Sequence, residues 1–221
     1  MIRKSDQLYQ TAAEKAYEAI SEKIISGEYE PGKRLVRRQL AQELGMSAIP
    51  ILEAMKRLEQ DGLIEYRAHW GSIVTIPTIE RVMDMFTMRE ALECQVARIL
   101  AVKATEEQQE LLLSLAKELD KVRYEGTDTE AVTHLHIKLH LQMAEFTGFP
   151  SLLAGLQKNN FQWLIFNATR SRRLRANIQP YWHETLLKQI FQHDPDHAEK
   201  KMREHIYDAY NPILEDLQQI H

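Results

Sequence analysis

The sequence contains few residues that could bridge distant segments or hold the chain in a membrane. It has one cysteine in 221 residues, Cys94, which excludes an internal disulfide and a metal site built from cysteines. No stretch of about 18 apolar residues runs without charges, which excludes a membrane-spanning helix. The N-terminus has no apolar run of the kind that a signal peptide needs. We therefore expect a cytoplasmic protein with no membrane partner.

The chain also lacks a strong charge bias and has few helix breakers. Its 28 lysines and arginines are set against 32 acidic residues, a formal net charge of -4, which excludes binding to nucleic acid through bulk positive charge. Hydrophobic residues make up 44% of the chain, enough for a buried core. Only 8 glycines and 7 prolines interrupt it, and apolar residues recur at spacings of three and four. The sequence therefore predicts a mainly α fold.

One segment departs from the helical pattern and divides the chain. Residues 63–77 place β-branched and aromatic residues around a short centre at residues 68–71, which predicts a two-stranded hairpin. We predict two domains, residues 1–77 and residues 78–221, the second an all-helical antiparallel bundle. In the first domain we predict helices over residues 12–26 and 36–44 and a third helix capped by Ser47. In the second domain the predicted helices cover residues 79–102, 105–123, 128–147, 150–174, 180–192 and 195–219.

The first domain has the plan of a winged helix-turn-helix. Two short helices joined by a tight turn at Gly45 and Met46 precede the hairpin, and in this plan the third helix of the domain enters the DNA major groove. Residues 1–76 hold 11 basic and 11 acidic residues, so affinity for phosphates must come from local clustering. The alternative is that the basic residues are ordinary solvated charges. The clustered cations are Lys33, Arg34, Arg37 and Arg38 ahead of the turn, with Lys56, Arg57 and Arg67 beyond it.

Residues 12–77 also carry an ordered series of small and apolar landmarks. The series is Ile25-Ser26-Gly27-Glu28, Pro31-Gly32-Lys33-Arg34-Leu35, Leu40-Ala41, Leu44-Gly45-Met46-Ser47, Pro50, Glu53-Ala54, Arg57-Leu58 and Gly62-Leu63-Ile64. Together these residues resemble the DNA-binding domain of GntR-family bacterial transcription regulators. The resemblance implies that Arg38 contacts a phosphate or a base and that Ser47 contacts a phosphate. It also implies that the hairpin tip, His69, Trp70 and Gly71, reaches the minor groove.

The third helix departs from the family pattern where DNA sequence is read. The family usually has an arginine after the capping serine, a threonine before the proline and an arginine before Glu-Ala. Here those positions hold Ala48, Ile49 and Leu52. With Lys56 they form the outward face of the helix, and they can contact thymine methyl groups but cannot read guanine as arginine does. The operator of the family therefore cannot be assumed.

Four of the nine histidines are predicted to face the interior of the second domain. His136 and His140, four residues apart, lie beside the apolar stripe of the helix predicted over residues 128–147. His183 and His205 share faces with apolar residues in two later helices. A single such histidine is more often a hydrogen-bonded core residue than a metal ligand. Because we expect few acidic partners in this core, a shared divalent cation would satisfy all four imidazoles. Zinc is our first choice, with nickel, manganese or iron as alternatives.

Further residues extend the family resemblance through the second domain. Leu139-His140, His183-Glu184 to Ile190, Met202-Arg203-Glu204-His205 and Met88-Arg89-Glu90-Ala91-Leu92-Glu93 resemble the all-helical effector domain, called FCD, of the FadR subfamily. In that family an aspartate four residues before the first histidine joins three histidines at one metal. The corresponding residue here is His136, so the site would consist of imidazoles alone. Family effectors are commonly small carboxylates held by the metal and an arginine, here Arg89. A salt bridge from Arg89 to Glu93 is an equally weighted alternative.

These expectations favour a ligand-responsive transcription regulator. It would act as a homodimer on a palindromic double-stranded operator, with a small organic acid as effector. One alternative is a metal-dependent hydrolase or lyase, with Glu184 or Glu204 as the nearest acid or base. Neighbouring helical residues point about 100° apart, which carries these carboxylates away from the metal, so we do not predict an enzyme. A second alternative is a regulator that acts mainly by protein contacts.

Overall fold

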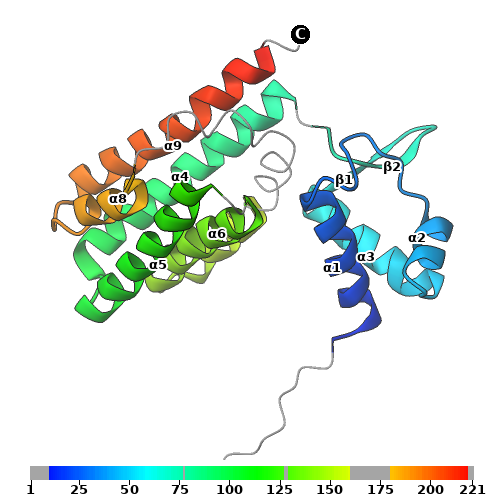
Figure 1. Ribbon diagram of the computed structural model, residues 1–221, viewed down its shortest axis with the longest axis horizontal. Coiled ribbons are helices and arrows are strands. Elements are labelled where there is room, and N and C mark those ends of the chain that lie inside the picture. Colours follow the sequence, from blue (N-terminus) through cyan, green and yellow to red (C-terminus); the bar gives the residue numbers. More distant parts are fainter. Residues whose placement is uncertain (1–9, 77, 127–128, 160–179, 219–221) are drawn as a thin grey trace, which may run out of the picture. The chain divides into compact units, whose positions relative to one another are not determined.

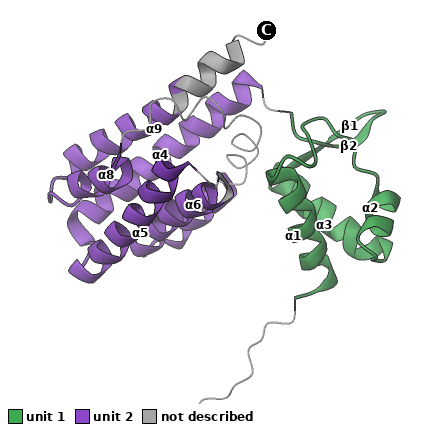
Figure 2. Cartoon of the chain, in the orientation of Figure 1, with its two compact units in different colours: residues 1–76 green, residues 77–221 purple. Residues whose placement is uncertain are grey.

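The computed structural model describes residues 10–76, 78–126, 129–159 and 180–218. The chain folds as two compact units, residues 1–76 and residues 77–221 (Figure 2). The predicted helix over residues 150–174 is described as far as residue 159, and its remainder lies outside the described residues. None of the described helices is long and apolar enough to cross a lipid bilayer.

The first unit contains three helices followed by a hairpin. These are α1 (Ala12–Ile25), α2 (Arg37–Glu43), α3 (Ala48–Gln60), β1 (Ile64–Arg67) and β2 (Gly71–Val74) (Figure 1). Thr11 and Glu14 form a capping box at the start of α1, which satisfies backbone donors that have no helical partner. Packing of α1 on α3 buries Ile20, Ile51 and Leu58 completely. This core fixes α3 so that its opposite face lies at the surface.

The hairpin is held to the segment that precedes α2. The two strands pair antiparallel, with Ile64 opposite Val74 and Arg67 opposite Gly71. Backbone hydrogen bonds from Leu35 to Ser72 and from Val74 to Lys33 then tie the chain around residue 34 along β2. Gly71 has φ +79°, a left-handed conformation that glycine adopts without strain. The wing is thereby anchored to the start of the helix-turn-helix.

The second unit is all helical in its described part. Its elements are α4 (Ile79–Lys103), α5 (Glu106–Glu125), α6 (Thr129–Phe146), a helical stretch at residues 150–159, α8 (Trp182–Ile190) and α9 (Pro195–Gln218). The helix α4 runs along α9, and α5 packs against both α6 and α8 (Figure 1). A shared apolar core includes Leu100, Leu119, Leu139 and Ile190. The predicted fold class, a winged helix-turn-helix followed by a helical domain, is confirmed.

Local sequence explains where these helices begin and end. Thr105 and Gln108 form a capping box at the start of α5, and Gly126 ends the same helix with φ +65°. The helix α8 begins differently, because Tyr181 precedes it in a left-handed conformation and makes no side-chain cap. Its first backbone N–H groups are satisfied by an acidic residue of another helix, which belongs to the site described below.

Candidate functional site

The exposed face of α3 is largely apolar. Ser47 occupies the N-cap position, but its hydroxyl makes no capping hydrogen bond, contrary to the capping role expected of it. Ala48, Ile49, Leu52 and Lys56 are all exposed, and Ile49 has 69% of its surface accessible. A surface isoleucine of this kind gains nothing from the core of its own domain. Apart from the Lys56 ammonium, the face therefore offers apolar contacts rather than hydrogen-bond donors.

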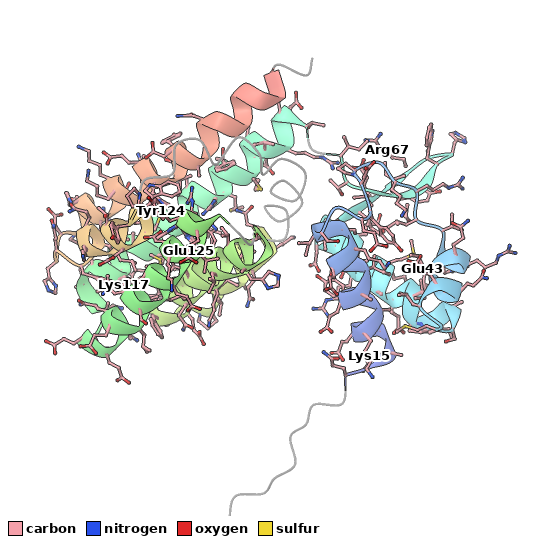
Figure 3. The ribbon with its side chains drawn as sticks, in the orientation of Figure 1. Lys15, Glu43, Arg67, Lys117, Tyr124 and Glu125 are labelled. Carbon is pink, nitrogen blue, oxygen red and sulfur yellow. The ribbon has the colours of Figure 1, made fainter. Side chains whose placement is uncertain are left out.

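The predicted basic residues and the hairpin tip are also at the surface. Arg34, Arg37 and Arg38 are exposed, as are His69 and Trp70, and Trp70 has 66% of its surface accessible. Arg34 lies beside the wing: a side-chain carbon built on Gly71 would stand 3.9 Å from Nε of Arg34. Sequence spacing did not indicate this contact, because it depends on the pairing of residue 34 with β2. Arg67, labelled on β1 in Figure 3, pairs with Glu65 at 2.7 Å.

The four predicted histidines converge in the second unit. His136 and His140 come from α6, His183 from α8 and His205 from α9, and one nitrogen of each lies within 4.8 Å of the others. The ring centroids of His136 and His140 are 4.5 Å apart, and those of His183 and His205 are 5.1 Å apart. His140, His183 and His205 are 3% exposed or less. Three helices thus present imidazoles to one buried point.

The expectation that this core has few acidic partners is wrong. Asp120 of α5 lies 2.6 Å from Nδ1 of His183 and also accepts hydrogen bonds from the backbone N–H groups of His183 and Glu184. Glu93 of α4 has one carboxylate oxygen 2.8 Å from Nδ1 of His140, although the two groups are not aligned for a straight hydrogen bond. Both carboxylates are buried. Each therefore stands behind one of the clustered imidazoles.

These two carboxylates were missed, although the sequence carried a signal for each. Asp120 follows Ala116 by four residues and so lies on the apolar face of its helix, where an acid is costly without a partner. Glu93 adjoins Val96 and Ala97 on the buried face of α4. An acid placed on an apolar stripe is a signal for a buried polar network. The partners themselves lie 63 residues and 47 residues away along the chain, beyond the reach of helical spacing.

Arg89 satisfies the salt-bridge alternative left open above. Its Nε donates to Glu93 at 2.7 Å, and the guanidinium is 1% exposed. Its Nη2 lies 3.5 Å from Nε2 of His140. Arg89, Glu93 and His140 therefore form one continuous polar chain that ends at the histidine cluster.

A second guanidinium lies near the cluster and was not predicted. Arg123 of α5 is positioned 4.3 Å over the ring of Trp182, whose ring centroid is 4.3 Å from that of His205. Burial lowers the pKa of Arg123 to about 10, opposed by the charge of Asp120. No hydrogen bond joins its guanidinium to any residue that the structure describes. Trp182 belongs to a set of aromatic residues in the second domain that could line a cavity or simply form core; the others, Phe161, Trp163 and Phe166, lie outside the described residues, as do Arg170, Arg172, Arg173 and Arg175.

Burial favours the neutral form of three of the clustered imidazoles, those of His136, His183 and His205. It lowers the pKa of His183 to about 4, although the hydrogen bond to Asp120 acts in the opposite direction. Burial and then neighbouring charges hold the pKa values of His136 and His205 well below 6.5. Burial would raise the pKa of Glu93, but Arg89 and His140 outweigh it and lower the value to about 2. Three imidazoles of the cluster are therefore held in the neutral form that metal coordination needs, next to the carboxylates of Glu93 and Asp120.

The two residues considered for catalysis, Glu184 and Glu204, face elsewhere, as do the other described histidines of the second unit. Glu184 pairs with Lys188 at 2.7 Å, and Lys117 of α5 (Figure 3) lies 4.0 Å from it. Glu204 is exposed and pairs with Lys201. His134 and His193 are exposed, and His197 bonds to Gln189 at 2.8 Å. None of these groups is placed to act as an acid or base at the cluster.

The family of the chain follows from comparison with known domains. Residues 12–74 match the bacterial regulatory proteins of the gntR family, and residues 84–208 match the FCD domain. The chain is a GntR-type regulator with an FCD domain. This regulator is therefore a DNA-binding transcription factor, and the families that it matches are regulators rather than enzymes.

Relatives and solved structures agree with this membership. An HTH-type transcriptional regulator of Bacillus subtilis, YdhC, is 25% identical to this GntR-type regulator over 92% of the chain and 90% of its own length. The structure of E. coli McbR/YncC superposes with a TM-score of 0.77 at 18% identity, covering 96% of this chain and all of that one. A GntR regulator from Rhodococcus gives a TM-score of 0.75 at 20% identity, covering 93% and 98%. At these identities the structural likeness supports the fold alone.

Proposed function

We propose that this regulator senses a small organic acid through a divalent transition metal held by His136, His140, His183 and His205. The observation that carries the proposal is the convergence of four imidazoles, three of them buried, whose candidate ligand atoms lie within 4.8 Å of one another. Bound metal would supply a Lewis-acid centre that an anionic effector can coordinate. Occupancy would then alter how the regulator engages DNA.

Unsatisfied nitrogen atoms support a metal at this place. Within the described residues, Nε2 of His183 and both ring nitrogens of His205 are buried without a hydrogen-bond partner. A buried polar atom left in this state costs about 1–3 kcal/mol, so a folded protein needs a reason to keep three of them. Coordination supplies that reason. An all-nitrogen donor set suits zinc, nickel or iron better than magnesium or calcium, and zinc is the first choice.

The effector would add an anion to a site whose ligands carry no charge. Four neutral imidazoles leave the charge of a divalent cation uncompensated among its ligands, which favours a carboxylate in any open position. Arg89 lies 3.5 Å from His140 and is the arginine indicated by the family resemblance. Because Arg89 already donates to Glu93, an effector would have to share or replace that contact. Arg123, above Trp182, is the competing guanidinium.

On the DNA side we propose a homodimer on a palindromic operator. Half-sites would lie about 34 Å apart, one helical turn of DNA. Arg34, Arg37, Arg38, Ser47 and Lys56 would contact phosphates and fix the orientation of the domain. The base edges would be met by Ala48, Ile49 and Leu52, while His69, Trp70 and Gly71 approach the minor groove. Thymine-rich half-sites fit such an apolar face.

Elemental analysis tests the metal proposal directly. The protein purified without added metal should contain about one transition metal ion per chain, and His140→Ala should remove it. His134→Ala, on the exposed face of the same helix, is the matched control and should retain the ion. Unchanged metal content in His140→Ala overturns the site assignment. Mass spectrometry of small acids released on denaturation would identify an effector that copurifies.

A gel-shift titration with genomic fragments tests the DNA proposal. A discrete retarded band at moderate salt is expected, and its salt dependence should reflect the phosphate contacts. Weak binding without sequence preference would instead favour a regulator that acts by protein contacts through the exposed apolar face of α3. The titration should be repeated with a zinc-loaded sample and a chelated sample, since a difference in affinity would link the two units.

A further inference from the structure

Two helices that contribute no proposed metal-binding histidine nevertheless place a carboxylate at the histidine cluster. Asp120 comes from α5 and Glu93 from α4, whereas the four histidines come from α6, α8 and α9. Each carboxylate meets the Nδ1 atom of one imidazole, at 2.6 Å for His183 and 2.8 Å for His140. Both carboxylates are at most 5% exposed. Their charges are therefore directed to the cluster and not to water.

We propose that Asp120 and Glu93 are positioning residues that orient His183 and His140 for metal binding. This inference rests on the metal proposed above. An ionised carboxylate only accepts hydrogen bonds, so the Nδ1 atom facing it carries the ring proton. The lone pair of the ring then lies on Nε2. In His183 this atom is the one that is buried without a hydrogen-bond partner.

The same two residues provide negative charge that the ligands lack. With His136 as a fourth imidazole, the donor set is neutral, and an ion transferred from water would keep its full charge in a buried site. A carboxylate hydrogen-bonded to a ligating histidine, as Asp120 is to His183, raises the basicity of the ring and offsets part of that charge. Asp120 places its carboxylate 2.6 Å from Nδ1 of His183 and also accepts two backbone N–H groups of α8, and Glu93 adds its charge with a carboxylate 2.8 Å from Nδ1 of His140.

Asp120 is the more rigidly placed of the two. Besides His183 Nδ1, it accepts the backbone N–H groups of His183 and Glu184 at 3.0 Å. These groups lie in the first turn of α8, where Tyr181 provides no side-chain cap. The one carboxylate thus starts the helix and orients the imidazole that the helix carries. The main chain and the ring of His183 are fixed together, which lowers the cost of assembling the site.

Glu93 instead links the cluster to a cation. One oxygen accepts from Nε of Arg89 at 2.7 Å, and the other faces His140 Nδ1. Any anion that draws Arg89 away would therefore change the partner of Glu93 and, through it, the orientation of His140. Metal affinity and acid binding would be coupled at this carboxylate.

Isosteric substitutions test the proposal with zinc as the probe. We expect Asp120→Asn and Glu93→Gln each to weaken zinc binding by about 10–100-fold, measured by competition with a chromophoric chelator. Asp196→Asn is the matched control, because this exposed aspartate pairs with Arg98 at a distance from the cluster. An asparagine oxygen still accepts the backbone N–H groups of α8, so the loss should exceed any change in helicity. Asp120→Glu, which keeps the charge, is a second variant for the case that the Asp120→Asn protein does not fold.

A spectroscopic measurement separates positioning from general destabilisation. In ¹⁵N-labelled zinc-loaded protein, His183 and His140 should show protonated Nδ1 and coordinated Nε2, and the variants should lose this uniform pattern. If the unaltered protein binds no zinc, the proposed metal function fails, and this inference with it. If it binds zinc and both variants bind within about twofold of it, the inference alone is overturned.

Discussion

The two units of this regulator place their chemistry in opposite environments. In the first unit, the residues proposed to meet DNA are exposed, with Ile49 and Trp70 each more than 60% accessible. In the second unit, the residues proposed to meet a ligand are buried except for His136, which is half-buried, and His183 is completely inaccessible. A buried polar group must be satisfied by its surroundings, whereas an exposed one is satisfied by water. The buried site is therefore constrained by the rest of its unit, while the exposed face of α3 is free to vary.

Because of this difference, the structure says more about the ligand of the buried site than about the DNA sequence that the exposed face would contact. The unsatisfied nitrogens of His183 and His205 call for a ligand of particular chemistry. Nothing in the fold dictates Ala48, Ile49 or Leu52, since each is exposed. In the proposed function, their identity depends on the DNA sequence that they would contact. In the second unit, the geometry of the fold supports a particular class of ligand. In the first unit, it supports only the way in which the domain would dock on DNA.

Removal of a buried histidine should have the largest effect. Zinc at about 100 times its dissociation constant should stabilise the second unit by about 2.7 kcal/mol, because it binds only the folded form. His183→Ala should abolish this stabilisation, measured as the zinc-induced shift in melting temperature. His193→Ala, an exposed histidine, should leave the shift unchanged. A variant lacking His183 that still gains the full shift would show that the ion binds elsewhere.

Exchange of one ligand type should change the metal preference. His136→Asp introduces a carboxylate where the chain has an imidazole, and oxygen donors suit manganese better than nitrogen donors do. We expect the ratio of manganese affinity to zinc affinity to rise several-fold, measured by competition titration of both ions. His134→Asp, two residues earlier and exposed, serves as the control. An unchanged ratio would mean that His136 does not coordinate the ion.

Acid should destabilise the second unit of the metal-free protein. Burial lowers the pKa of His183 to about 4 and those of His136 and His205 well below 6.5. The unfolded chain takes up these protons near pH 6.5, so below that value it binds more protons than the folded state. Stability is therefore complete above about pH 6.5 and falls toward pH 4. Circular dichroism melts at stepped pH measure this, and a melting temperature that is constant through that window would contradict it.

Alkali should act on the first unit. Tyr29 donates to Glu43 at 2.8 Å, and burial together with this bond raises the pKa of Tyr29 to about 12. The folded state keeps the phenolic proton that the unfolded chain releases near pH 10, so stability is complete below about pH 10 and falls as the pH approaches 12. Tyr29→Phe should flatten this part of the profile. Persistence of the full alkaline loss in Tyr29→Phe would assign it to another group.

The smallest effects are expected on the exposed face of α3 that we propose to contact DNA. Lys56→Ala should reduce the slope of log affinity against log salt by about 0.9, the value for one phosphate contact. Ile49→Ala should leave that slope unchanged. It should weaken binding by roughly 1 kcal/mol, and the loss should depend on the identity of a single base pair in the fragment. Fluorescence anisotropy with a retained genomic fragment and its point variants measures both. If Ile49→Ala changes the salt slope and Lys56→Ala does not, the assigned roles are reversed.

Helical spacing accounts for what could be predicted from the sequence. The spacing of His136 and His140 and the apolar neighbours of His183 and His205 were sufficient to place four rings on buried faces. The hairpin and the exposed face of α3 also followed from local pattern. Asp120 was not assigned to the site, because its position depends on how α5 packs against α8. The tie between Arg34 and the wing depends on strand pairing in the same way. Local periodicity shows which side of an element is buried but not which residue it will meet.

The convergence of α6, α8 and α9 on one point has a mechanical consequence. This chain has a single cysteine and so cannot form an internal disulfide. An ion held by residues from 136 to 205 would close a long loop of chain and restrict the unfolded ensemble as a covalent cross-link does. Unlike a disulfide, such a cross-link would form and dissociate with the concentration of metal in the surroundings.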